Sequence, residues 1–186
     1  GDMLDAVIAH FPEAEEGEGE DERPRVAIVG KPNVGKSSLL NVLTGEERAI
    51  VTDIAGTTRD VLEEHINLKG ISLNVLDTAG IRQTDDIVEK IGVDRAREYA
   101  EKADLLICVI DASTGLDEND LDILKMIERK PSVILLNKSD LDMLVTAEDI
   151  KKTLFAINPA KFTKGFLENL PIIEISAKKI LGIDEF

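Results

Sequence analysis

Apolar runs of strand length alternate with amphipathic stretches from residue 25 onward. The strand-like runs lie at 25–30, 61–68, 71–76, 105–110, 132–136 and 171–175. Helical patterns lie near 36–43, 91–102, 118–129 and 147–157, and again at the extreme end of the chain. This alternation predicts an α/β fold, in which helices cross over between the strands of one sheet.

The second and third strand-like runs are separated by Lys69 and Gly70 alone. A turn of that length joins neighbouring antiparallel strands, so we expect this pair to be antiparallel and the other strands to be parallel. Ligands of such sheets bind at the carboxyl ends of the strands. Motifs at these ends are therefore the first candidates for a site.

The composition fits one globular domain that does not span a membrane. The 186 residues are 43% hydrophobic and 32% charged, which is ordinary for a globular protein. No apolar run approaches about 18 residues, and no basic region followed by a hydrophobic stretch opens the chain. These features predict a cytoplasmic protein. The single cysteine, Cys108, lies within an apolar run and is expected to be a core residue.

The net charge of −15 is concentrated near the N-terminus. Residues 1–22 hold nine acids and no Lys or Arg, which leaves 28 acids against 22 bases in the remainder. The remainder therefore has no basic footprint for nucleic acid. We expect residues 1–22 to form a short helix and an acidic linker, and residues 23–186 to form the domain.

The segment from Gly30 to Ser37 has the spacing of a phosphate-binding loop, with a strand-like run before it and a helical pattern after it. Gly30 and Gly35 allow a tight turn in which backbone N–H groups point at one anion. Lys36 would lie over the outer phosphates, and the Ser37 hydroxyl would ligate Mg²⁺.

A second motif, Asp77-Thr78-Ala79-Gly80, follows the run at 71–76. Mg²⁺ takes few protein ligands, so Ser37, a hydroxyl from a mobile loop and a water-mediated contact to Asp77 would suffice. The N–H of Gly80 can meet a γ-phosphate, and its backbone can swing once the phosphate leaves.

Two further motifs suit a guanine base. Asn137-Lys138-Ser139-Asp140 follows the run at 132–136, and the Asp140 carboxylate can accept two hydrogen bonds from guanine, whereas adenine offers no such donor pair. Asn137 would bond the base or brace neighbouring loops, and the stem of Lys138 would cover the ring face. Ser176-Ala177-Lys178 follows the last strand and offers a backbone amide to the guanine oxygen.

With these four motifs in order, residues 25–186 resemble the Era-like group of translation-factor-related GTPases. The resemblance implies a P-loop NTPase fold, a Ras-like G domain whose six-stranded sheet is mostly parallel with one antiparallel strand. It also implies that the enzyme hydrolyses GTP to GDP and phosphate. The nucleotide-binding residues that it implies are Asn33, Val34, Gly35, Lys36, Ser37, Ser38, Asn137, Lys138, Asp140, Ser176, Ala177 and Lys178.

The segment 50–60 is similar to the first switch loop of the MnmE (TrmE) and Der (EngA) families, and this assigns Thr58 to Mg²⁺. Residues 77–96 resemble the second switch of MnmE, the tRNA-modification GTPases, almost residue for residue. Der would have a basic stretch there, and usually a Trp at the place of Ser139. Residues 2–22 instead resemble the linker between the two GTPase domains of Der, so both families stay open.

Ile81 stands where Ras-like GTPases place a water-orienting glutamine, and an aliphatic side chain cannot orient water. The MnmE pattern assigns that task to Glu89, which from its residue type alone would be a solvated surface acid. The pattern assigns K⁺ to four residues of the phosphate and switch loops, namely Asn33, Thr52, Ile54 and Thr57. Catalysis is thereby assigned to Glu89, Gly80 and Lys36, with Mg²⁺ and K⁺ as cofactors.

The MnmE resemblance also implies partners. It predicts a nucleotide-dependent homodimer through the switch loops, and contacts with tRNA and a flavin-linked modification partner through domains outside this chain. The sequence ends about where a last helix should begin, so the chain is expected to be an excised domain. Because the MnmE resemblance places tRNA modification in further domains, the chain is expected to hydrolyse GTP without modifying tRNA. The alternative is the GTPase domain of a Der-type ribosome-assembly factor, a binding module that depends on the nucleotide.

Overall fold

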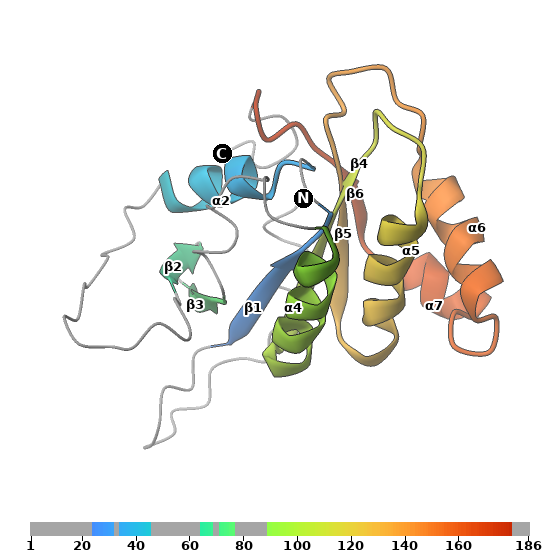
Figure 1. Cartoon of the computed structure of the whole chain (residues 1–186), viewed down its shortest axis with the longest axis horizontal. Helices are drawn as coiled ribbons and strands as arrows, with labels where there is room; N and C mark the ends of the chain where they lie inside the picture. The colour runs from blue at the N-terminus through green and yellow to red at the C-terminus, as the bar shows by residue number, and fades with distance from the viewer. Residues whose placement is uncertain (1–23, 32–33, 46–63, 69–70, 77–88, 180–186) are drawn as a thin grey trace.

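A computed structural model of the protein describes residues 24–31, 34–45, 64–68, 71–76 and 89–179 (Figure 1). The N-terminal helix and acidic linker predicted for residues 1–22 lie outside the described residues, as do the turn at 69–70 and the last helix. The region that the structure describes holds the sheet and most of the helices that the sequence pattern predicts.

Within the described residues, six strands form one sheet in the order β2-β3-β1-β4-β5-β6. The strands are β1 (Arg25–Val29), β2 (Glu64–Leu68), β3 (Ile71–Val75), β4 (Leu105–Asp111), β5 (Ser132–Asn137) and β6 (Ile172–Glu174). β2 pairs with β3 in the antiparallel sense, and the other neighbouring strands are parallel. The α/β fold class is confirmed.

The helices between these strands are α2 (Lys36–Gly45), α4 (Glu89–Lys102), α5 (Glu118–Lys125), η1 (Met126–Arg129), α6 (Ala147–Ile157) and α7 (Lys164–Asn169). The helical pattern at 118–129 is split, because the α-helix ends at Lys125 and a 3₁₀ turn follows. Lys130 then has an extended backbone, as expected for a residue before a proline. The short helix α7 was not predicted.

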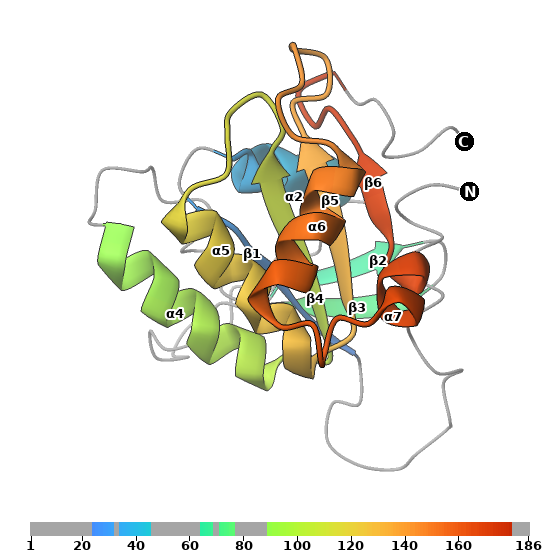
Figure 2. The same ribbon diagram turned by 90° about the vertical axis from the view of Figure 1, so that its right-hand side faces the viewer.

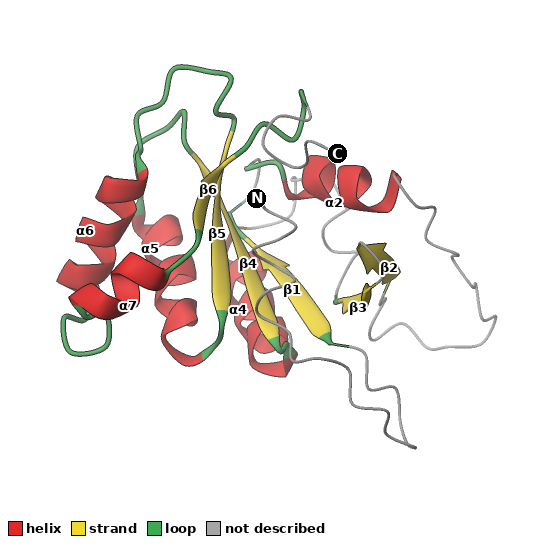
Figure 3. Cartoon of the chain, turned by 180° about the vertical axis from the view of Figure 1, so that it is seen from behind, coloured by secondary structure: helices red, strands yellow, loops and turns green. Residues whose placement is uncertain are grey.

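Two hydrophobic cores lie on the two faces of the sheet. α2 packs on one face through Leu39, Leu40 and Leu43. On the other face, α4, α5, α6 and α7 pack on a second core that includes Cys108. Figure 2 shows α4, α5 and α6 in a row over this face, and Figure 3 shows α5, α6 and α7 on the opposite side of the strands from α2. Every residue of β4 and β5 is buried, as expected for parallel strands covered on both faces.

Cys108 is a core residue, as predicted: its side chain is fully buried, and burial raises the pKa of its thiol to about 12. A thiol in this environment stays protonated and is not a nucleophile at neutral pH. None of the described helices is long and apolar enough to cross a membrane.

The carboxyl ends of the parallel strands meet at one edge of the sheet. Gly30 follows β1 there, and Asp111 of β4 lies in register with Asn137 of β5. Ile175 follows β6 and donates its backbone N–H to the Leu136 carbonyl. The sheet therefore places at one edge three of the loops that carry predicted site residues.

Candidate functional site

The phosphate loop joins β1 to α2, and close neighbours leave no room for a side chain at either of its two glycines. A Cβ added to Gly30 would lie 2.7 Å from the Val109 carbonyl oxygen. Gly35 has a φ of +102°, and a Cβ there would collide with the Nδ2 atom of Asn137. Glycine is therefore required at Gly35 both by the backbone conformation and by the space left by its neighbour.

The side chain of Lys36 bends back over this loop, because its Nζ donates a 2.6 Å hydrogen bond to the Gly30 carbonyl. Ser37 and Ser38 follow in the first turn of α2, and both are exposed. Val34 is fully buried and anchors the loop in the core. The loop thus presents an ammonium group and two hydroxyl groups at the N-terminus of a helix, where anions bind.

Asn137 joins three segments of the site. Its side chain is buried at the end of β5, and its Nδ2 donates to the Val34 carbonyl at 2.8 Å. Its Oδ1 accepts the Ala177 backbone N–H at 3.0 Å. The structure thus contains the bracing contacts that the sequence predicted as one of two options for Asn137. A direct contact with the base stays a prediction.

Asp140 is held by the segment after β6. The Ser176 hydroxyl donates to Asp140 Oδ1 at 2.7 Å, and Lys179 Nζ lies 3.7 Å from Oδ2. The hydrogen bond from Ser176 lowers the pKa of Asp140, because it stabilises the ionised form. Asp140 is therefore an oriented carboxylate at neutral pH, able to accept two N–H groups from a planar base.

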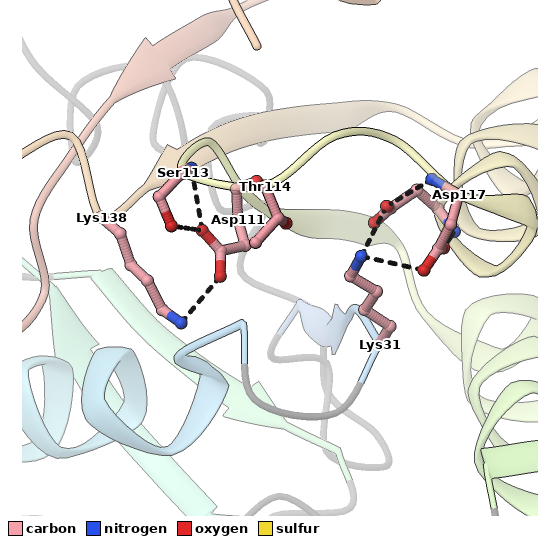
Figure 4. Close-up of polar contacts among 7 residues, drawn as sticks. Lys31, Asp111, Ser113, Thr114, Asp117 and Lys138 are labelled. Atoms are coloured by element: carbon pink, nitrogen blue, oxygen red, sulfur yellow. Dashed lines mark hydrogen bonds and ion pairs between the residues drawn. The ribbon is translucent and has the colours of Figure 1, made fainter. Parts of the chain in front are cut away.

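Lys138 lies between Asn137 and Asp140 in the sequence and adopts a left-handed backbone conformation with a φ of 63°. Its Nζ forms a 2.7 Å ion pair with Asp111 Oδ2, and Ser113 donates both its N–H and its hydroxyl to Asp111 Oδ1 (Figure 4). Burial alone would raise the pKa of Asp111, but the hydrogen bonds from Lys138 and Ser113 outweigh it and lower the pKa. The carboxylate at the end of β4 thus fixes where the Lys138 side chain lies.

Asp111 was not predicted as part of the site. Its contact with Lys138 joins residues far apart in the sequence, and local pattern does not encode such a contact. The available signal was an acid at the carboxyl end of a buried strand, the position that the other motifs share.

Several predicted site residues lie outside the described part of the chain. They are Asn33, Thr52, Ile54, Thr57, Thr58, Asp77 and Gly80. Glu89 is described only as the first residue of α4. The structure therefore brings together the predicted base and phosphate residues, while most of the predicted metal ligands stay predictions. Of those ligands Ser37 is described, and its exposure in the first turn of α2 fits an ion that also holds phosphate oxygens.

Residues 25–138 match the family model described as 50S ribosome-binding GTPase. The chain is 51% identical over 175 residues to a tRNA modification GTPase MnmE of Clostridioides difficile, covering 94% of this chain and 35% of that protein. It is also 51% identical over 161 residues to a protein of the same name from Lachnoclostridium phytofermentans, covering 87% of this chain and 32% of that protein. The chain thus spans about a third of the length of these curated relatives.

Solved structures agree with this fold. Aquifex aeolicus Era bound to GDP and AlF4⁻ has a TM-score of 0.56 and 33% identity, covering 88% of this chain and 54% of that one. The G domain of the Thermotoga maritima FeoB iron transporter has a TM-score of 0.55 at 24% identity, covering 87% of this chain and 92% of that one, and at that identity the likeness concerns the fold alone.

Proposed function

This chain belongs to the family of 50S ribosome-binding GTPases and is a GTP-hydrolysing enzyme, and from that premise we propose that it is the potassium-stimulated switch domain of a tRNA wobble-uridine modification GTPase. The carrying observation is the arrangement around Asn137, which ties the phosphate loop to the segment that orients Asp140. The name of the MnmE relatives supports the tRNA part of the proposal.

In this proposal the guanine base is selected by Asp140. Its carboxylate accepts the N1–H and the exocyclic amine of guanine, and the hydrogen bond from Ser176 orients it. The Ala177 amide bonds Asn137 in the structure, so its use by the guanine oxygen would require that bond to be shared or exchanged. The stem of Lys138, held by Asp111, would cover the ring face.

The phosphates would bind to the loop between Gly30 and Ser38. Lys36 would exchange its bond to the Gly30 carbonyl for the outer phosphate oxygens, where its charge stabilises the transferred group. Ser37, Thr58 and, through water, Asp77 would hold Mg²⁺, which neutralises negative charge on the phosphates. Gly80 would donate its N–H to the γ-phosphate and change conformation once that phosphate leaves.

The attacking water is assigned to Glu89, the first residue of α4. A carboxylate can accept a proton of that water and orient it, a task for which the aliphatic Ile81 has no group. K⁺ would be held by Asn33, Thr52, Ile54 and Thr57 and would place a positive charge beside the phosphates. A single preorganised hydrogen-bond donor in an oxyanion hole lowers a barrier by about 3 kcal/mol, and a fixed cation beside the phosphates would act in the same sense.

Replacing Glu89 by Ala tests this assignment. Turnover at saturating GTP should fall about a hundredfold, while GTP affinity stays within about twofold, because the water is oriented in the chemical step. Glu98→Ala on the same helix is the matched control, since Glu98 is exposed and its ion pair within the described residues is with Lys102, one turn further along α4. A fall in affinity with turnover preserved would make Glu89 a structural residue.

A second candidate function is a nucleotide-dependent binding module of a Der-type ribosome-assembly factor. Two observations favour it: the ribosome-binding description of the family model and the resemblance of residues 2–22 to a Der linker. In the longer protein, GTP-dependent co-sedimentation with ribosomes would favour this function. Capture of a flavin-linked partner that modifies wobble uridine would favour the first.

The partners follow from the same proposal. The switch loops would form a homodimer when the transition state is mimicked, so gel filtration should give a larger species with GDP and AlF4⁻ than with GDP. An unchanged elution volume would contradict dimerisation. Contacts with tRNA and the modification partner would come from parts of a longer protein, and this chain alone would hydrolyse GTP without modifying tRNA.

A further inference from the structure

A single segment, residues 111–120, contacts lysines of two different nucleotide loops (Figure 4). It runs from the end of β4 to the first turn of α5. At its start Asp111 pairs with Lys138 of residues 137–140, here called the base-selecting turn. At its end Asp117 and Asp120 pair with Lys31 of the phosphate loop. None of these three acids is among the residues predicted to touch the nucleotide.

The contact with the phosphate loop is short, and it is shielded from solvent on the side of Asp120 but open on the side of Asp117, whose side chain is 53% exposed. Lys31 Nζ lies 2.9 Å from Asp120 Oδ2 and 3.1 Å from Asp117 Oδ2. The side chain of Lys31 is 15% exposed and that of Asp120 only 2%. Because Lys31 directly follows Gly30, this contact fixes the backbone at the start of the loop.

The same two acids form the N-terminal cap of α5. Asp117 accepts the N–H of Asp120, and Asp120 accepts the N–H of Asp117, so each acid fixes the other. A helix that is capped in this way gives Lys31 a rigid anchor. The position of the phosphate loop is therefore tied to the position of α5.

Burying the Asp120 carboxylate costs free energy, and its role as a helix cap does not require that burial. Its Oδ1 atom is buried and has no hydrogen-bond partner among the residues that the structure describes. Burial raises the pKa of Asp120 in spite of the opposing bonds from Lys31 and Asp117. Exposed acids cap helices well, and buried ion pairs contribute little net stability. The burial and pairing of this acid therefore indicate that it holds the Lys31 side chain in a fixed position.

The contact with the base-selecting turn is likewise an ion pair between a lysine and a buried aspartate that further hydrogen bonds hold in place. Asp111 is 7% exposed, and two bonds from Ser113 fix its carboxylate while it holds Lys138. Lys138 has a left-handed backbone, which an ordinary side chain adopts at a cost and which its surroundings must maintain.

We propose that segment 111–120 positions the phosphate loop and the base-selecting turn relative to each other, with Asp120 and Asp111 as positioning residues. The inference rests on the proposed function, because that assigns the phosphates to Lys36 and guanine to Asp140. In this proposal neither acid contacts the nucleotide, and both act through the positions of the two loops.

The direction in which GDP affinity changes when either acid is replaced by Asn distinguishes a positioning role from a purely electrostatic one. Both acids place negative charge near a polyanionic ligand, so charge alone predicts that Asp120→Asn and Asp111→Asn bind GDP more tightly. If the acids position the loops, both variants should bind GDP about tenfold more weakly, a loss of about 1.4 kcal/mol. The test is the GDP affinity of the purified chain by titration calorimetry, after circular dichroism has shown that each variant is folded.

Asp122→Asn is the matched control, because it removes the same charge from α5 at a side chain that is 42% exposed. It should bind GDP like the wild type. Lys31→Arg preserves an ion pair with both acids and should bind within about twofold of the wild type, whereas Lys31→Met should lose about tenfold. An Arg variant as weak as the Met variant would contradict positioning through these pairs.

The outcomes separate the two proposals. A wild-type chain that does not bind GDP would refute the proposed function. A wild-type chain that binds GDP, with both Asn variants binding equally or more tightly, would refute the positioning role alone. If Asp120→Asn does not fold, Asp111→Asn still decides the question, because charge alone predicts tighter GDP binding for that variant as well.

Discussion

The chemistry of the site depends on single side chains whose charge and direction are set by one or two neighbours. Asp140 carries the guanine preference in our account, and the Ser176 hydroxyl holds it at 2.7 Å. Lys138 is held by Asp111, and Lys36 by the Gly30 carbonyl. Each of these contacts is specific enough for one substitution to change a measurable property.

Replacing Asp140 by Asn should remove guanine recognition. The amide keeps the size of the side chain but loses one acceptor and gains a donor that faces the N–H groups of guanine, so GDP affinity should fall at least about a hundredfold. Affinity for xanthosine diphosphate, which offers an oxygen in place of the amine, should rise in the same variant. Titration calorimetry with both nucleotides checks this, and Asp142→Asn at the exposed neighbouring acid is the control. Unchanged GDP affinity would remove Asp140 from the base site.

Replacing Ser176 by Ala should shift the titration of Asp140. The pKa of Asp140 is lowered, so the stability that this carboxylate contributes is present at neutral pH and is lost as the pH falls through the folded pKa. Without the hydroxyl, that midpoint should move up toward the ordinary aspartate value of about 3.9. Carbon NMR of the aspartate carboxyl groups measures it.

Ser113→Ala is the control for this shift, because it removes a hydroxyl from Asp111 and none from Asp140. It should raise the pKa of Asp111, which Lys138 and Ser113 lower, and leave that of Asp140 unchanged. If Ser176→Ala does not move the midpoint of Asp140, the hydroxyl does not lower the pKa of that carboxyl group.

At the scale of elements, the site is built by strand ends that the parallel sheet brings to one edge. Asn137 at the end of β5 links the loop before α2 with the segment after β6. Segment 111–120 links the phosphate loop and the base-selecting turn on the side of α5. The loops are therefore fixed to one another by side chains at the ends of β4 and β5 and at the start of α5.

Replacing Asn137 by Ala should destabilise the free protein. The Val34 carbonyl and the Ala177 amide would each lose a buried partner, which costs about 1–3 kcal/mol per group. The free energy of unfolding in urea, measured without nucleotide, should fall by about 2–4 kcal/mol. Asn169→Ala is the control, since Asn169 is exposed and its side-chain bond within the described residues goes to the Gly165 carbonyl in its own helix. A fall of less than about 0.5 kcal/mol for Asn137→Ala would contradict its bracing role.

The sequence predicted the elements well where hydrophobic periodicity was strong. The buried strands β4 and β5 lie within one residue of their predicted bounds, and α6 matches its predicted range. α7 was missed because it has six residues, of which Leu167 alone is buried, so it has no amphipathic repeat to detect. The 3₁₀ turn η1 was read as α-helix because the apolar pattern continues through it up to Pro131.

The motif residues of the site could be predicted because each follows a strand at a fixed spacing. The residues that hold them could not. Lys31 and Asp120 are 89 positions apart, and Asn137 and Ala177 are 40 apart. Such pairs depend on the order of strands in the sheet, which local pattern does not encode.

At the scale of the whole molecule, the chain is one sheet with helices on both faces and its site at the carboxyl edge. It spans about a third of the length of its MnmE relatives. Its net charge of −15 offers no general attraction for nucleic acid. In our account this chain supplies the nucleotide switch, and contact with tRNA belongs to a longer protein.

The central claim is that Glu89 orients the attacking water, the task of a glutamine in Ras-like GTPases, and that K⁺ supplies a positive charge beside the phosphates. The most direct measurement is the rate of GTP hydrolysis by this chain in KCl and in NaCl at equal ionic strength, with saturating Mg²⁺ and GTP. We predict turnover at least about tenfold faster in KCl, because the ion stabilises charge that develops in the transition state. Equal rates in the two salts would contradict the account.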